Sequence, residues 1–275
     1  MLINTRAAVL PRLLLLLWTL LAIGCAKAPV RMADDGGNWE QLKDERHYQI
    51  QVQRGAIAAP PARLRLPEVR TAKDAHDAKV SAAQAQLVAN QLARSTCLAL
   101  APYAEYAEDA GSRLRLAVRS IGRTNEGAAA ASTVVGFFVP GPFRLPAGMG
   151  SLAVDAELRS DSVETPFEMR WARGANPLLH DAKWSEIGDA WQLAPSFGRD
   201  LRNALYDEDP STSGLQASKQ PKTVIEANRR LCRERFGTIN VAAQGLSRVL
   251  PLAPEAYDGG GEDAGDAAKP ADEAP

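Results

Sequence analysis

The chain has 275 residues, of which 45% are hydrophobic and 24% are charged. Lysine and arginine number 32 and aspartate and glutamate 33, so the formal net charge is −1. This balance excludes the basic footprint of a nucleic-acid-binding protein, and no nucleic-acid partner is predicted. The length suits one globular domain with additional segments, or at most two small domains.

The N-terminus has the parts of an export signal. Arg6 and Arg12 precede or border an uncharged run, Leu13–Ile23, which is shorter than the roughly 20 apolar residues of a membrane-spanning helix. The run ends in Ala22-Ile23-Gly24-Cys25, which resembles the lipobox of bacterial lipoproteins. That resemblance implies a signal peptide over 1–24, acylation of Cys25 and a membrane anchor through its lipid.

Positions 26 and 27 are alanine and lysine. By analogy with lipoprotein sorting signals, they imply the periplasmic face of the outer membrane. The alternatives are a plain secretory signal with Cys25 as an ordinary thiol, or a helix that is not cleaved. We expect residues 25–44 to form a flexible tether between the anchor and the folded part.

The body of the chain predicts an α+β fold over residues 45–206. Tyr48–Val52 alternates in polarity like a strand, and Ala58–Pro67 is proline-bearing and predicts a loop or edge segment. Thr71–Asp74 and Ser81–Gln84 both match a capping box, so we expect a helix that runs to about Ala99.

Three further strands are predicted: Arg113–Ile121, Leu152–Leu158 and Phe167–Ala172. Each alternates apolar with charged residues, which is typical of an antiparallel sheet with one wet face and one face covered by helices. On the wet face, basic and acidic strands side by side predict solvated salt bridges. A helix over Trp184–Asp207 would supply the cover, interrupted at Pro195.

The remainder divides into a polar linker with a C-terminal helical segment (207–250) and an acidic tail (251–275). A helix is expected over Lys222–Phe236, stopped by Gly237. The tail contains little to bury, so we expect it to be disordered. Cys97 and Cys232 remain once Cys25 is set aside; they form either a disulfide across 135 positions or two buried free thiols.

The segment from Arg113 to Leu205 resembles a family of bacterial envelope lipoproteins to which no activity is assigned. The resemblance lies in the strand Arg113–Ile121, the strand Ser151–Leu158 with its serine-bearing turn, and Trp184–Trp191 at the start of the closing helix. It implies an α+β fold and an envelope location, and it brings no catalytic residues.

No nucleophile–base pair, phosphate-binding loop or metal motif is present in the sequence, and its three histidines are scattered. We therefore predict no catalytic residue, no metal and no cofactor, and interpret the protein as a non-enzymatic binding or envelope-structural module. The candidate surface for an envelope protein partner is an apolar segment, which serves either as a strand of the sheet or as a partner-binding or membrane-touching edge. Its apolar residues are Val134, Val135, Phe137, Phe138 and Phe143.

An alternative function is the carriage or sensing of a small apolar ligand. The ligand would lie between sheet and helix, near Trp171, Trp184 and Trp191.

Overall fold

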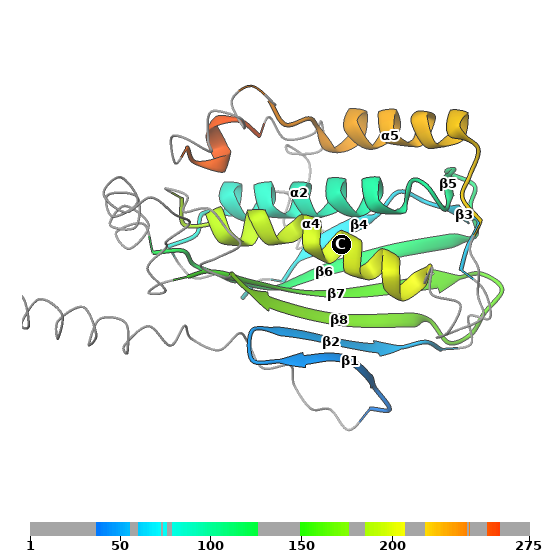
Figure 1. The fold of residues 1–275 in the computed structure, drawn as a ribbon, viewed down its shortest axis with the longest axis horizontal. Coiled ribbons are helices and arrows are strands. Elements are labelled where there is room, and N and C mark those ends of the chain that lie inside the picture. Colours follow the sequence, from blue (N-terminus) through cyan, green and yellow to red (C-terminus); the bar gives the residue numbers. More distant parts are fainter. Residues whose placement is uncertain are drawn as a thin grey trace, which may run out of the picture.

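The computed structural model describes residues 37–55, 60–72, 74–75, 79–125, 149–175, 185–206, 218–240, 242 and 252–258. Within these ranges the chain forms a six-stranded sheet in the order β1-β2-β8-β7-β6-β4 (Figure 1). The strands are β1 (Glu40–Glu45), β2 (Tyr48–Gln53), β4 (Glu68–Thr71), β6 (Ser112–Gly122), β7 (Ser151–Ser160) and β8 (Phe167–Gly174). A small second sheet pairs β3 (Arg63–Leu64) with β5 (Glu105–Tyr106).

All neighbours in the large sheet are antiparallel except β4, which runs parallel to β6. Helices α2 (Ala82–Leu100) and α4 (Gly188–Leu205) cover one face, and α5 (Lys222–Phe236) lies outside α2 as a further layer (Figure 1). The predicted α+β class, with an antiparallel sheet covered by helices on one face, is confirmed.

The core lies between the sheet and the helices α2 and α4. The alternation of the strands places Leu116, Val154 and Met169 on the covered face, where each is at most 1% exposed. From the helices, Leu92 and Phe197 are fully buried against them. Burial of such side chains stabilises the fold by roughly 1.5–3 kcal/mol each.

Helix α2 begins as predicted, at a capping box in which Gln84 N–H donates to Ser81 Oγ and Ser81 N–H donates to Gln84 Oε1. The predicted capping box at Thr71–Asp74 was wrong. Thr71 is the last residue of strand β4, which pairs with β6. At this position the main chain pairs with β6, so the side-chain hydrogen bonds of a helix cap are not formed.

The expected interruption at Pro195 was also wrong, because α4 continues through it. The apolar stripe on both sides of the proline is buried against the core, including Trp191 and Leu201. This packing holds the two halves as one helix although one main-chain hydrogen bond is lost. Close packing with α2 also requires Gly198, since a Cβ there would lie 2.8 Å from Ser95 O.

Two predicted segment boundaries need correction. Residues 40–44, expected in the tether, belong to β1 and pair with β2. Residues 252–258, expected in the disordered tail, fold back on the core with a short 3-10 helix, Pro254–Ala256. Asp258 explains this, because its carboxylate accepts hydrogen bonds from Arg94 Nη2 at 2.6 Å and Trp191 Nε1 at 2.7 Å.

Candidate binding groove

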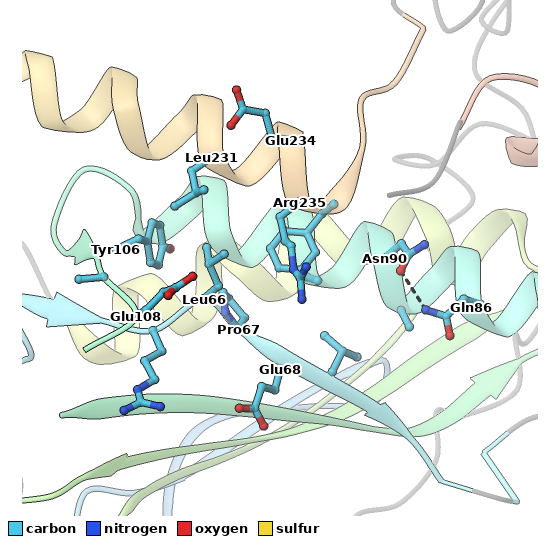
Figure 2. Close-up of a pocket in the computed structure, with 16 residues that line it drawn as sticks. Leu66, Pro67, Glu68, Gln86, Asn90, Tyr106, Glu108, Leu231, Glu234 and Arg235 are labelled. Carbon is cyan, nitrogen blue, oxygen red and sulfur yellow. Dashed lines mark hydrogen bonds between the residues drawn. The ribbon is translucent and has the colours of Figure 1, made fainter. Parts of the chain in front are cut away.

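A groove of about 780 Å³ lies between the end strand β4 and the helices α2 and α5 (Figure 2). It is lined on one side by residues 65–69, on another by Gln86 to Ala93 of α2, and on the third by Leu231 to Phe236 of α5. Tyr106 to Glu108 close one end. The groove therefore depends on how the outer helix α5 is held above α2.

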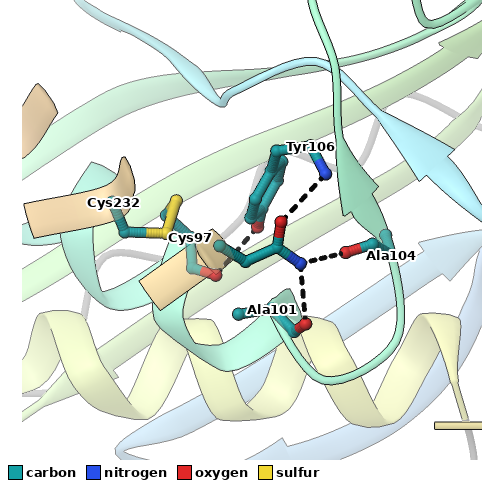
Figure 3. Close-up of a disulfide and its surroundings, with 6 residues drawn as sticks. Cys97, Ala101, Ala104, Tyr106 and Cys232 are labelled. Carbon is teal, nitrogen blue, oxygen red and sulfur yellow. Dashed lines mark hydrogen bonds between the residues drawn. A yellow bond between two sulfur atoms is a disulfide. The ribbon is translucent and has the colours of Figure 1, made fainter. Parts of the chain in front are cut away.

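A disulfide between Cys97 and Cys232 fixes α5 to α2 (Figure 3). The Cα atoms are 5.8 Å apart and both side chains are fully buried. The sequence left open a disulfide or two free thiols, and the structure has the disulfide. It is typical of proteins that fold in an oxidising compartment.

Asn228 provides the second attachment of α5. Its Nδ2 donates to Ala101 O at 3.0 Å and to Ala104 O at 2.8 Å, and its Oδ1 accepts from Tyr106 N–H at 3.2 Å (Figure 3). The side chain thus satisfies the carbonyl groups of the turn after α2. Tyr106 also donates its hydroxyl to Cys97 O, and burial raises the pKa of this phenol well above 10.0.

The walls of the groove are mixed in polarity. Val69, Leu231 and Phe236 contribute apolar surface, and Leu231 is 36% exposed although it is a large aliphatic residue. Charged side chains of both signs surround this surface: Arg65, Arg235, Glu68, Glu108 and Glu234. Such a surface suits a ligand that has both apolar and hydrogen-bonding groups.

Asn90 lines the groove, and its side-chain amide has a hydrogen-bond donor without a partner among the described residues. It is 7% exposed, and its Oδ1 accepts a hydrogen bond from Gln86 Nε2 at 2.9 Å (Figure 2). Its Nδ2 is buried and has no hydrogen-bond partner among the residues that the structure describes. A buried donor without an acceptor costs about 1–3 kcal/mol, so this amide favours a ligand acceptor in the groove.

The opposite face of the sheet carries the predicted salt bridges. Arg119 Nε lies 2.6 Å from Asp155 Oδ2, and Arg159 pairs with Glu157. These side chains are partly or largely exposed to solvent, so each pair contributes at most about 1 kcal/mol. This face is a solvated charged surface, as the alternation of the strands predicted.

Of the residues that the sequence indicated for function, some lie outside the described residues and others lie in the core. Cys25 lies outside the described residues, as does the candidate partner-binding set Val134, Val135, Phe137, Phe138 and Phe143. Trp184 lies outside them too. Trp171 and Trp191, expected near a small apolar ligand, are 1% and 4% exposed and pack on other core side chains.

Sequence reasoning missed the groove. Its residues come from four separated stretches of the chain, and none of them forms a local motif. Leu231 gives a local signal, because it is a large apolar residue within an arginine-rich stretch that includes Arg229, Arg230 and Arg233.

The described part of the chain contains no group of three metal-ligating side chains placed to hold an ion. In the same ranges, no helix combines the length and the apolar character needed to cross a membrane.

No protein-family model matches the chain, and no curated protein matches it. Among solved structures it is similar to PelC from Paraburkholderia phytofirmans, described as a dodecamer, with 13% identity and a TM-score of 0.31 over 57% of this chain and 96% of that one. A PelC variant from the same organism gives 16% identity and a TM-score of 0.33 over 59% of this chain and 99% of that one. Similarity at this level assigns neither a family nor a function.

Proposed function

We propose that the protein is an exported lipoprotein, anchored through a lipid on Cys25 to the periplasmic face of the outer membrane. Its folded part is a non-enzymatic module that binds an envelope protein. The supporting observation is the buried disulfide between Cys97 and Cys232, which forms and persists in oxidising compartments such as the periplasm. It agrees with the export signal and lipobox of the first 25 residues.

The positions of anchor and fold support this arrangement. Strand β1 begins at Glu40, so about 15 residues separate Cys25 from the first strand. If extended, that stretch reaches roughly 50 Å. This length lets the folded part stand clear of the lipid surface and present its groove to other envelope components.

Metabolic labelling with radioactive palmitate tests the anchor. Wild-type protein should incorporate label and fractionate with the outer membrane, whereas Cys25→Ser should do neither. Cys97→Ala/Cys232→Ala is the control, because it removes the two disulfide-bonded cysteines, which the proposal does not acylate, and keeps Cys25. Equal labelling of wild type and Cys25→Ser would contradict the proposal.

A carrier of small apolar ligands has less support. The side chains of Trp171 and Trp191 are satisfied within the protein, since their Nε1 atoms donate to Asp200 Oδ2 at 2.9 Å and to Asp258 Oδ2 at 2.7 Å. Native mass spectrometry of the purified protein distinguishes the two functions, because a carrier retains a ligand of defined mass.

A further inference from the structure

Strand β4 stands at an end of the large sheet, and its outer edge borders the groove. In the ladder with β6, Ala72 N–H donates to Val118 O at 3.1 Å. Alternate residues of a strand turn their main-chain N–H and C=O groups to the same side. The main-chain groups of Glu68 and Arg70 therefore point toward β6, like those of Ala72. The main-chain groups of Val69 and Thr71 point outward, away from β6.

The groove lies beside this edge and not over one face of the sheet. It is lined by both Glu68 and Val69, and successive residues of a strand point to opposite faces. The cavity therefore extends past the outward main-chain groups of Val69. β4 is four residues long, which gives an edge of about 13 Å.

Helix α5 and helix α2 form the roof and back wall along this edge (Figure 2). Leu231 and Phe236 of α5 offer apolar contacts, while Asn90 of α2 offers an Nδ2 donor that has no partner in the described part of the chain. Among the described residues, the groove thus combines a strand edge with no neighbouring strand, an apolar wall and a buried donor without an acceptor.

We propose that the groove binds an extended peptide segment of a partner protein, which adds to β4 as a further strand of the sheet. Main-chain N–H and C=O groups of the peptide pair with those of Val69 and Thr71. A peptide carbonyl is the acceptor for Asn90 Nδ2. Side chains at alternate positions of the peptide face Leu231 and Phe236, so apolar residues are favoured there, and the intervening ones lie on the side of Glu68.

A peptide fits these features better than other ligands. An acyl chain or small hydrocarbon would fill the apolar wall but leave the outward main-chain groups and Asn90 Nδ2 unpaired. Charged groups of both signs, including Arg235 and Glu234, border the groove, so no strongly anionic or cationic polymer is selected. The inference rests on the proposed binding role and is independent of lipid attachment at Cys25.

The test begins with a displayed library of random twelve-residue peptides, selected on the full chain purified in detergent and counter-selected on Val69→Pro. Proline at position 69 removes an outward N–H and leaves the main-chain bonds of Glu68 and Arg70 to β6 in place. Edge strands tolerate proline at such positions. An enriched peptide is then synthesised with a fluorophore, and its dissociation constant is measured by anisotropy.

We expect binding to weaken at least ten-fold in Val69→Pro and in Leu231→Asp. Leu42→Asp, which places the same charge at an exposed residue of β1 on the opposite edge of the sheet, should leave binding unchanged. Leu231→Asp changes an exposed position and carries the test alone if Val69→Pro does not fold. Added peptide should also slow hydrogen exchange of the Val69 and Thr71 amides.

The proposal is overturned if no peptide is enriched on wild type over Val69→Pro, or, where that variant is unfolded, over Leu231→Asp. It is also overturned if Leu42→Asp weakens binding as much as Leu231→Asp. Neither outcome bears on the palmitate labelling of Cys25. The peptide-binding proposal and the lipid-anchor proposal are therefore tested by separate measurements.

Discussion

Reduction of the disulfide should destabilise the protein and release α5 first. The Cys97–Cys232 bond closes a loop with a sequence separation of 135. For a loop of that size, the chain-entropy relation gives about 5 kcal/mol at 25 °C. This value is an upper estimate, because residual structure in the unfolded chain lowers the entropy that the bond removes.

The attachment of α5 suggests where the loss appears. Of its 15 residues, three are buried: Asn228, Cys232 and Phe236. Once the bond is broken, a helix with so little buried surface should open locally before α2 and α4 do. Local opening of α5 would also widen the groove, since Leu231 and Phe236 line it.

The assay is urea unfolding of the full chain in detergent, followed by tryptophan fluorescence with and without a phosphine reductant. With an m-value of about 2.5 kcal/mol per molar urea, the full effect lowers the midpoint by about 2 M. Hydrogen exchange should show faster exchange in α5 than in α2 after reduction. The double variant Cys97→Ala/Cys232→Ala is the control, because the reductant should not change its midpoint. A midpoint shift below about 0.4 M on reduction of the wild type would refute this reasoning.

Three further perturbations test the contacts around α2 and α5. Asp258→Ala should lower the free energy of unfolding by about 3–5 kcal/mol in the same urea assay, because it leaves the buried Arg94 guanidinium unpaired; a loss below 1 kcal/mol would show that the C-terminal segment is not docked. Asn228→Ala should cost about 3 kcal/mol by loss of three hydrogen bonds, and a midpoint equal to that of wild type would contradict this attachment. Burial raises the pKa of Tyr106 and of Tyr206, so the folded state keeps both phenols protonated where the unfolded chain ionises. Stability should be complete below pH 10 and fall above it by about 1.4 kcal/mol per pH unit for each phenol; in alkaline urea titrations, Tyr106→Phe should lessen that slope, and an unchanged slope would contradict it.

The long strands and helices could be predicted because their patterns are local. Strand β6 alternates from Ser112 to Val118, and α2 begins at a capping box whose two partners are three residues apart. Alternation also predicted which face of the sheet would carry salt bridges. The physical reason is that periodicity alone determines the face on which a side chain lies.

The docked C-terminal segment could not be predicted, because its composition indicates disorder while long-range contacts determine its place. Asp258 stands in a stretch rich in glycine and acidic residues, and its partner Arg94 is 164 positions away. Strand β4 was missed for a related reason. It has four residues, two of them charged, and it is held by pairing with β6, which no local pattern records.

The groove depends on tertiary structure in the same way. Cys97 and Cys232 were visible in the sequence, but their pairing depends on a distance between helices that the sequence does not give. That pairing sets α5 above α2 and leaves open space beside β4. The unpartnered amide of Asn90 is likewise defined only by the absence of an acceptor near it among the described residues.

In the proposed lipoprotein, the mature chain begins at a lipid-bearing Cys25. Mass spectrometry of the protein purified from membranes tests it most directly, through the tryptic peptide Cys25–Lys27. We expect this peptide to carry a diacylglyceryl group on Cys25 Sγ and an acyl chain on its amino group, with no residue of 1–24 attached. An unmodified Cys25 within a longer N-terminal peptide, from protein recovered in the cytosolic fraction, would contradict it.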